Sequence, residues 1–246
     1  MNKNKDLNLE EVFALALENH QKNNFDAAQN LYNQTLKIDP NHIVALNNLG
    51  VILKALDQHQ NAISCYEKAI KINPNYADAH NNLGTILNKL KQYNKAISCY
   101  EKAIKINPNY ADAHSNLGVS HNDLGQYQKA KKCYERAIEI NPNLINSHYN
   151  LANIFMALAD YQKAISCYEK VIEIDPNNIN AYNNLGVAFE YLGKREKAQS
   201  CYEKVIEIDP NYAPVYNNLG VLLRATDQPK AQSCYEKAIE IDPKYL

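Results

Sequence analysis

Cysteine and histidine have the side chains best suited to metal binding or nucleophilic chemistry, and both recur here at a fixed spacing. The cysteines lie 34 residues apart, or 33 for the last pair: Cys65, Cys99, Cys133, Cys167, Cys201 and Cys234. Equivalent residues of neighbouring structural units lie roughly 10 Å apart when helices pack. A disulfide needs Cα atoms closer than about 7 Å, and zinc needs sulfur atoms at about 2.3 Å. We therefore expect packing cysteines in a reducing compartment.

Three histidines follow the same period, at His80, His114 and His148. The same distances prevent them from sharing a metal ion, so we expect them to pack between helices. His121 has no Ser, Cys or carboxylate at a spacing that suggests catalysis. The sequence also lacks a glycine-rich phosphate loop, a CxxC pair and a His-Glu-x-x-His motif. We predict no catalytic residue, no metal and no cofactor, and hence no enzyme.

The same period organises the whole chain. The stretch AISCYEKAIKINPNYADAH occupies residues 62–80 and returns unchanged at 96–114. A fixed period of this length indicates stacked repeats. After a polar N-terminal segment, 1–8, which ends in a candidate helix cap at Asn8, we predict a single solenoid over residues 9–245. Its seven repeats are 9–42, 43–76, 77–110, 111–144, 145–178, 179–212 and 213–245.

Each repeat is predicted to contain two amphipathic helices. In the second repeat, the first helix presents an apolar face with the spacing i, i+3, i+4, i+7. The second helix presents a similar face, and Pro74 then ends it because proline cannot continue a helix. The residues of the two faces are Leu46, Leu49, Gly50 and Leu53, then Ala62, Tyr66, Ala69 and Ile70. The small residue Gly50 lets the paired helices approach closely. The predicted fold class is an all-α solenoid.

Composition excludes several classes of partner. The formal net charge of −1 provides no basic surface for nucleic acid or anionic lipid. No apolar run approaches the 18 residues or so that a membrane span needs, and the N-terminus lacks the apolar core of a signal peptide. We expect a soluble cytoplasmic protein with neither nucleic-acid nor membrane partners.

Counted from the start of each repeat, positions 4, 7, 8, 11, 20, 24, 27 and 32 resemble the tetratricopeptide repeat. In the second repeat these positions hold Leu46, Leu49, Gly50, Leu53, Ala62, Tyr66, Ala69 and Pro74. The resemblance implies a right-handed superhelix whose first helices line a concave groove and whose second helices face outward. The first repeat is the least typical, as expected of a capping repeat.

The last repeat is one residue short near Asp227. Because a stack normally ends in a polar cap, we expect its second helix to expose apolar residues such as Ile239. Either the chain continues beyond Leu246, which we favour, or another copy covers this end.

An asparagine stands at position 6 of six successive repeats: Asn48, Asn82, Asn116, Asn150, Asn184 and Asn218. Asparagine is a poor helix former, so its recurrence calls for an explanation. Its side chain both donates and accepts hydrogen bonds. Six such side chains roughly 10 Å apart would follow an extended peptide of about 15 residues. We call these six residues the asparagine ladder and predict that they bind a peptide or partner protein in the groove.

Positions 9 and 12 of the groove vary, and their polar members Asn88, Asn122 and Asn153 are predicted to add selectivity. A structural role is the alternative for the ladder, because asparagine at position 6 also bridges neighbouring helices in this family. The ladder resembles that in the tetratricopeptide arm of the O-linked N-acetylglucosamine transferases, which grips substrate backbones.

The leading hypothesis is a non-catalytic interaction scaffold. The alternatives are a substrate-recruiting arm of a larger glycosyltransferase-like enzyme and a scaffold that self-associates through its C-terminal repeat. Capture of a partner's C-terminal carboxylate is disfavoured, because the basic clamp it requires is replaced by asparagine at position 6.

Acidic and basic residues also pair along the second helices, outside the groove. The pairs are Glu67-Lys68, Glu101-Lys102, Glu135-Arg136, Glu169-Lys170, Glu203-Lys204 and Glu236-Lys237. We expect them to form a solvated face in which the charges balance.

Overall fold

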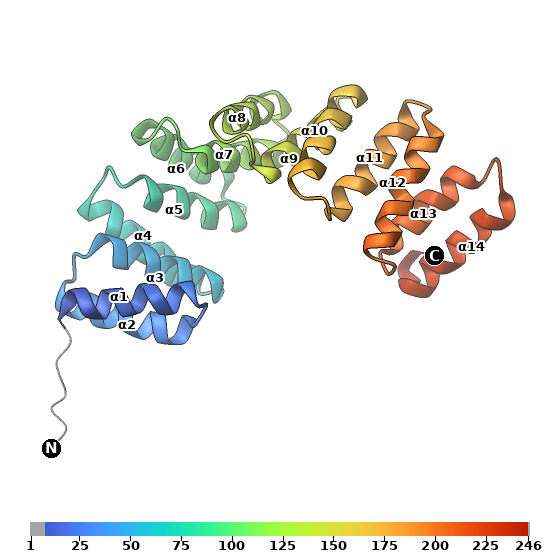
Figure 1. The fold of residues 1–246 in the computed structure, drawn as a ribbon. Helices are drawn as coiled ribbons and strands as arrows, with labels where there is room; N and C mark the ends of the chain where they lie inside the picture. The colour runs from blue at the N-terminus through green and yellow to red at the C-terminus, as the bar shows by residue number, and fades with distance from the viewer. Residues whose placement is uncertain (1–7, 246) are drawn as a thin grey trace, which may run out of the picture. The chain divides into compact units, whose positions relative to one another are not determined.

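The computed structural model describes residues 8–245, which form fourteen α-helices and a short 3-10 turn at Pro243–Tyr245 (Figure 1). The first helices of the repeats are α1 (Leu9–Gln21), α3 (Ile43–Ala55), α5 (Ala77–Lys89), α7 (Ala111–Asp123), α9 (Ile145–Ala157), α11 (Ile179–Tyr191) and α13 (Ala213–Leu223). The second helices are α2 (Phe25–Ile38), α4 (His59–Ile72), α6 (Tyr93–Ile106), α8 (Tyr127–Ile140), α10 (Tyr161–Ile174), α12 (Arg195–Ile208) and α14 (Gln228–Ile241). The predicted all-α repeat solenoid is confirmed.

The chain divides into two compact units between Cys133 and Tyr134. In the first unit, α4 packs against α3 of its own repeat and against α5 of the next, and α3, α5 and α7 also contact one another in sequence. The second unit repeats this pattern, with α10 packed between α9 and α11, and α12 between α11 and α13. Within each unit the second helices therefore pack between successive first helices, and we refer to the first helices together as the first-helix layer.

The N-terminal segment predicted over residues 1–8 lies outside the described residues except for Asn8. The Asn8 Oδ1 accepts the Glu11 N–H at 2.9 Å, and the Asn8 N–H donates to Glu11 Oε2 at 3.1 Å. These reciprocal bonds form a capping box, which satisfies the backbone N–H groups of Asn8 and Glu11 at the start of α1.

The turns between repeats are closed by the same side-chain to backbone hydrogen bond. In each turn the side-chain oxygen of an Asn or Asp accepts the backbone N–H two residues later, as Asn73 Oδ1 does from Asn75 at 2.9 Å. Side chains of this kind close a turn, and the intervening proline has no N–H with which to continue the helix. The same bond, at 2.9–3.2 Å, forms at Asp39, Asn107, Asn141, Asp175, Asp209 and Asp242.

The loop within each of the first six repeats contains one residue in the left-handed region, at position 15. Glycine occupies it twice, at Gly125 and Gly193, each with φ 69°. Residues with a Cβ occupy it elsewhere, at φ 56–59°: Asn23, Asp57, Lys91 and Ala159. The left-handed conformation is unfavourable for a residue such as alanine. The geometry of this short loop therefore overrides local preference at Ala159.

A tyrosine lies between the two helices of each repeat, and it is buried in the first six repeats. Tyr66 is fully buried, and a Cβ added to Gly50 would lie 2.5 Å from its Cε1 atom. The tyrosine ring thus occupies the room that a larger residue at position 8 would need. The last repeat differs, because its tyrosine, Tyr235, is only half-buried, as is Ile239. Within the described residues, α14 packs mainly against α13 and the 3-10 turn at Pro243–Tyr245.

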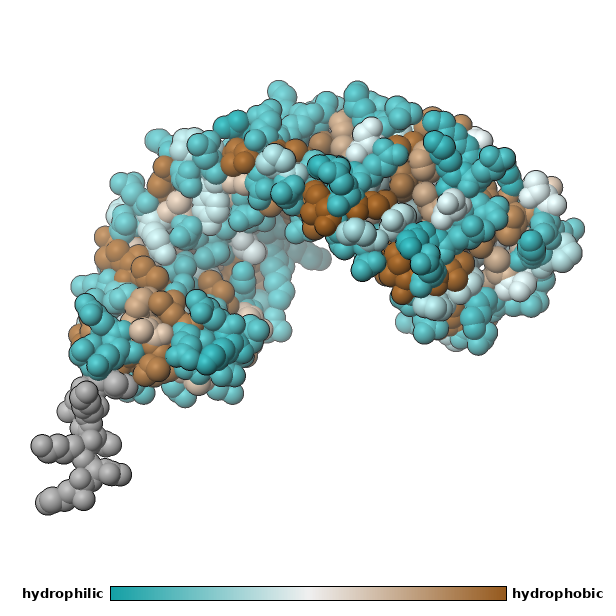
Figure 2. All heavy atoms as spheres, viewed as in Figure 1, coloured by the Kyte–Doolittle hydropathy of each residue, from teal (hydrophilic) through white to brown (hydrophobic). Residues whose placement is uncertain are grey.

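The surface is largely polar. Figure 2 shows a face that is mostly hydrophilic, with hydrophobic residues in separate patches. No helix among residues 8–245 is both long and apolar enough to cross a membrane.

Candidate functional site

The asparagine ladder lies half-buried on the first helices, and several of its members bond to the preceding repeat. In the first compact unit, Asn82 Nδ2 donates to Asn47 Oδ1 at 3.0 Å. Asn116 Nδ2 donates in the same way to Asn81 Oδ1 at 3.1 Å. In the second unit, Asn218 Nδ2 donates to Asn183 Oδ1 at 2.9 Å. Position 6 of one repeat is therefore joined to position 5 of the repeat before it.

Two ladder residues have tyrosine hydroxyls as partners. Asn48 Nδ2 donates to the hydroxyl of Tyr32 at 3.3 Å, since the first repeat offers no position-5 amide. Asn184 Nδ2 donates to the hydroxyl of Tyr149, which stands at position 5 of its repeat, at 3.0 Å. Asn150 is half-buried like the others.

The position-5 acceptors are residues that the sequence reasoning missed. Asn47 and Asn81 are each 6% exposed and Asn183 is 8% exposed. The signal for them was the doubled asparagine of the NNLG tails, of which only the second member was interpreted.

The inter-repeat bonds leave part of each ladder amide available. An asparagine amide carries two N–H groups and one carbonyl oxygen. The bond to the preceding repeat uses one N–H of Asn82, Asn116 or Asn218. Their carbonyl oxygens accept no hydrogen bond from residues 8–245. The bonds to the preceding repeat thus fix the orientation of each of these three amides. The carbonyl oxygen and the second N–H of each amide remain available to a ligand.

The three further predicted groove residues have different surroundings. Asn88 Oδ1 accepts from the hydroxyl of Ser120 at 2.6 Å, and its Nδ2 donates to Asp123 Oδ2 at 3.3 Å. Asn153 Oδ1 accepts from the Tyr168 hydroxyl at 2.6 Å and from Asn184 at 3.5 Å. Asn122 is exposed. Asn153 is therefore joined to the ladder, whereas Asn88 links two repeats beside it.

Two lysines lie on this same layer of first helices. Lys89 Nζ pairs with Asp57 Oδ1 at 2.8 Å. Lys54, at position 12, is half-buried and has no acidic partner among the described residues. Burial, and then the charge of Lys89, lower the pKa of Lys54. An unpaired, partly desolvated cation of this kind would favour a ligand with an acidic side chain.

The histidines have structural partners. His80 Nε2 lies 2.9 Å from the carbonyl oxygen of Pro74, and His114 and His148 make the equivalent contacts at 3.1 and 2.9 Å. A carbonyl oxygen only accepts, so Nε2 carries the proton and donates it. These histidines therefore tie the first helix of each repeat to the turn before it. His121, which is buried, hydrogen-bonds through Nδ1 to Gln126 Oε1 at 2.9 Å.

The cysteine thiols are poorly reactive. Burial raises the pKa of Cys133 and Cys167 to about 11 and that of Cys201 to about 12. Since the thiolate is the nucleophile, these groups remain unreactive at neutral pH. No group of three or more His, Cys, Asp or Glu side chains within residues 8–245 is placed to hold a metal ion.

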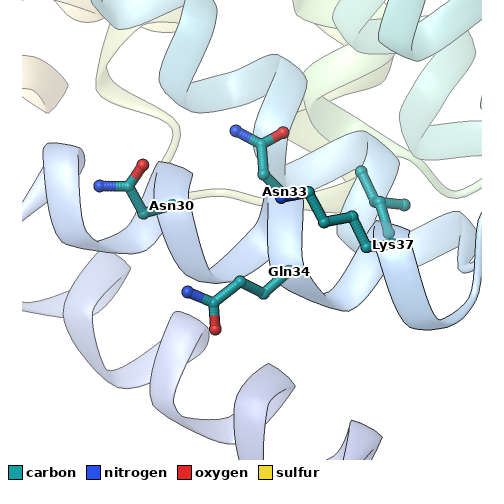
Figure 3. Close-up of a pocket in the computed structure, with 5 residues that line it drawn as sticks. Asn30, Asn33, Gln34 and Lys37 are labelled. Carbon is teal, nitrogen blue, oxygen red and sulfur yellow. The ribbon is translucent and has the colours of Figure 1, made fainter.

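A shallow hollow also lies on α2, away from the first-helix layer. Figure 3 shows Asn30, Asn33, Gln34 and Lys37 along one face of that helix, and Leu36 completes the lining. These side chains offer amide groups and one cation, with little apolar surface to enclose a ligand.

Stacked helix pairs with a half-buried row of polar side chains define an α-helical repeat scaffold. The chain matches the tetratricopeptide repeat family over residues 12–42, 43–76, 77–110, 111–144, 143–211 and 201–232. It belongs to that family, as its sequence pattern indicated. Proteins built of this repeat are generally non-catalytic interaction scaffolds, and the family points to protein partners.

Several solved structures are similar. A MamA protein is 27% identical, over 70% of this chain and 93% of that chain, with a TM-score of 0.61. YrrB, described as a TPR protein with an unusual peptide-binding site, is 24% identical, over 75% and 95%, with a TM-score of 0.61. PilF of Pseudomonas aeruginosa is 20% identical, over 84% and 94%, with a TM-score of 0.76. The last two likenesses show the fold alone. No curated protein matches the chain significantly.

Proposed function

We propose that the layer of first helices binds an extended peptide, or an extended segment of a partner protein, through the asparagine ladder. This proposal rests on the hydrogen-bonding groups that remain on two side-chain amides. Asn82 and Asn116 each donate one N–H to the preceding repeat, and each keeps a carbonyl oxygen that accepts no hydrogen bond from residues 8–245. A carbonyl oxygen accepts from a peptide N–H, and the second amide N–H can donate to a peptide carbonyl.

The inter-repeat bonds favour binding because they hold the amides in place before a ligand arrives. A side chain that is already ordered loses less conformational entropy on binding. With repeats roughly 10 Å apart and an extended chain rising about 3.3 Å per residue, one ladder amide meets every third peptide residue. The first compact unit offers two such amides, Asn82 and Asn116, and the second offers Asn218. Asn184 differs, because its Oδ1 accepts from Asn183 at 3.2 Å and its Nδ2 donates to Tyr149 and Asn153.

Selectivity would come from the variable groove positions. Lys54 is an unpaired cation, Asn88 is held between two repeats, and Asn122 is exposed. The proposed ligand is therefore recognised by its backbone over its length and by its side chains at a few positions.

The same inter-repeat bonds also support the structural alternative, because they explain the recurrence of asparagine without any ligand. The test must therefore separate binding from stability. A change in the ligand does so, since it leaves the protein untouched.

The experiment starts from a random peptide library selected on the intact chain. In the best peptide, each backbone N–H is replaced in turn by an ester oxygen. We expect an affinity loss of about 2- to 13-fold, the equivalent of one hydrogen bond, at every third position, and little loss between them. If every ester position leaves the affinity unchanged, the ladder is structural only.

A protein-side experiment complements it. The double variant Asn82→Ala/Asn116→Ala should weaken binding of the same peptide, whereas the exposed Asn94→Ala on α6 should not. Circular dichroism of each variant shows whether the helices are intact. Equal affinity of the two variants for the peptide would contradict the proposal.

A second candidate function is self-association through the C-terminal repeat. Tyr235 and Ile239 are half-buried, whereas the six equivalent tyrosines of the other repeats are buried. Apolar surface of this kind favours stacking with another copy. Sedimentation over a range of concentrations tests it: a dimer that Ile239→Lys dissociates supports the idea, and a strict monomer at high concentration rules it out.

The remaining assignments follow from the chemistry of the chain. Buried, neutral thiols fit a reducing compartment, so we place the protein in the cytoplasm. The net charge of −1 favours protein over nucleic-acid partners. A role as the recruiting arm of a larger transferase rests on the repeat resemblance, and the full reading frame would test it.

A further inference from the structure

The charge at position 29 of the second helices changes sign along the chain. It is lysine in the first three repeats, at Lys37, Lys71 and Lys105, and glutamate in the next three, at Glu139, Glu173 and Glu207. The equivalent residue of the last repeat, which is one residue short, is Glu240. In the last four repeats the glutamate pairs with the basic residue three positions earlier. The pairs are Arg136–Glu139 at 2.9 Å, Lys170–Glu173 at 2.7 Å, Lys204–Glu207 at 2.9 Å and Lys237–Glu240 at 3.0 Å.

The second and third repeats lack this compensation. There the residue three positions before Lys71 or Lys105 is again a lysine, Lys68 or Lys102. None of these four lysines forms an ion pair in the described part of the chain. Like charges one helical turn apart destabilise a helix. Ion pairs therefore compensate the charge at this position in the last four repeats, whereas in the second and third repeats two lysines lie one turn apart beside a single glutamate, Glu67 or Glu101.

A hollow of about 620 Å³ is lined by two of these lysines, Lys102 and Lys105, and by Ile70, the residue before Lys71 in the sequence. Lys102, Lys105 and Ile106 of α6 form one side, and Ile70 and Pro74 of the preceding repeat form the other, with Asn75 and His80 completing the lining. His80 already donates its Nε2–H to Pro74. The lining therefore combines the apolar residues Ile70, Pro74 and Ile106 with the cations Lys102 and Lys105, and the volume suits a large side chain.

We propose that this hollow binds an acidic peptide segment that carries one large apolar residue. The apolar side chain lies between Ile70 and Ile106, and flanking Asp or Glu side chains pair with Lys71, Lys102 and Lys105. A phosphate-rich ligand would engage the lysines and leave the apolar walls exposed to water, so a peptide fits better. Lys37, which lines the hollow on α2 (Figure 3), extends the basic row by one repeat.

This site is separate from the asparagine ladder. Its lining lysines and Ile106 belong to a second helix, whereas the ladder residues lie on first helices. The lining residue His80 lies on the first helix α5, and its Nε2–H is already donated to Pro74. A protein with both sites would hold one partner along the first helices and another on the second helices.

The test uses the intact chain and a fluorescein-labelled decapeptide of Asp and Glu with one central Leu, measured by fluorescence anisotropy at low salt. The variant Lys71→Glu/Lys105→Glu places in both repeats the residue that the later repeats have, so each helix gains an i,i+3 pair and should stay folded. An exposed ion pair contributes about 1.4- to 5-fold in affinity. Two lost pairs and two new repulsions should therefore weaken binding about tenfold or more.

Matched controls separate the site from general charge. Lys129→Glu/Lys194→Glu changes two exposed lysines elsewhere by the same total charge and should alter the affinity less than twofold. The loss of affinity in Lys71→Glu/Lys105→Glu itself distinguishes this site from the ladder, because both lysines lie on second helices, α4 and α6. Replacing the central Leu by Ser should weaken the peptide about fivefold or more, because the apolar contact is lost.

Four results would overturn the proposal. The first is no binding of the peptide, and the second is equal binding by Lys71→Glu/Lys105→Glu. The third is equal affinity of the Leu and Ser peptides. The fourth is binding to something other than the peptide. Lysine-dependent binding to phosphatidylserine vesicles without peptide binding would assign the basic row to a membrane, and lysine-dependent dimerisation without peptide binding would assign it to a second copy of the chain.

Discussion

The bond between Asn116 Nδ2 and Asn81 Oδ1, 3.1 Å long, gives the most direct test of how neighbouring repeats are joined. Asn116→Ala removes the donor and leaves Asn81, which is only 6% exposed, without that partner. A buried acceptor that loses its partner costs about 1–3 kcal/mol. Alanine recovers about 0.6 kcal/mol because it is the better helix former. We expect a net destabilisation of about 0.5–2.5 kcal/mol.

Asn122→Ala is the matched control, because Asn122 is an exposed residue near the end of the same helix, α7. It gains helix propensity and loses no buried partner, so its stability should equal or exceed that of the parent. A double-mutant cycle with Asn81→Ala isolates the bond itself, with an expected coupling of about 0.5–1.5 kcal/mol.

Urea unfolding followed by circular dichroism at 222 nm measures these differences. Because repeats stabilise one another as nearest neighbours, the curves are fitted with a separate interface energy for each pair of repeats. The loss should appear in the interface between the third and fourth repeats. If Asn116→Ala is as stable as Asn122→Ala, or if the coupling lies below about 0.3 kcal/mol, the bond does not join the repeats.

Three further predictions concern the loops and the buried tyrosines. Ala159→Gly replaces an alanine held in the left-handed region at φ 56° and should raise the free energy of unfolding by about 1 kcal/mol. Gly125→Ala should lower the free energy of unfolding by a similar amount, and thermal unfolding measures both. A change of the same sign in both variants would contradict this. Gly84→Val places a Cβ 2.7 Å from the Cε1 atom of the buried Tyr100 and should lower the free energy of unfolding by about 3 kcal/mol. An unchanged midpoint of urea unfolding would show instead that the tyrosine ring can move aside. Burial raises the pKa of Tyr100 to about 12, so its contribution to stability is complete below pH 10 and disappears as the pH rises through 12. The part of the tyrosinate absorbance that Tyr100→Phe removes should therefore rise together with the loss of helical dichroism above pH 10. If that part rises near pH 10 while the helical dichroism is intact, the prediction is wrong.

The fold was predictable because the period and the apolar spacing both depend on local sequence. Pro74 and its flanking asparagines mark a turn, and the faces containing Leu49 and Tyr66 mark the two helices. The left-handed residue at position 15 was not predictable, because the position holds residues as different as Lys91 and Ala159. Its conformation is imposed by the length of the loop between two packed helices.

The candidate site was only partly predictable. The sequence indicated a recurring asparagine at the edge of the apolar face, and Asn82 does lie half-buried there. Its partner Asn47 is 35 residues earlier, so the bond depends on how two repeats stack. The lysines of the outer face were visible in the sequence but were grouped with the preceding glutamates. Contacts three residues apart along the helix, such as Lys170 with Glu173, show which charges compensate each other.

The bond from Asn82 to Asn47 also bears on how a chain of this kind can change in length. The later repeat supplies the donor and the earlier one the acceptor, so a repeat with both asparagines can follow any other such repeat. A duplicated gene segment then inserts with matching groups at both of its junctions, and a deletion of one period closes without leaving an unmatched group. The identical stretches at 62–80 and 96–114 are what such a duplication produces. Mutation can thus lengthen or shorten the row of first helices by whole repeats while every junction between such repeats keeps a matched donor and acceptor.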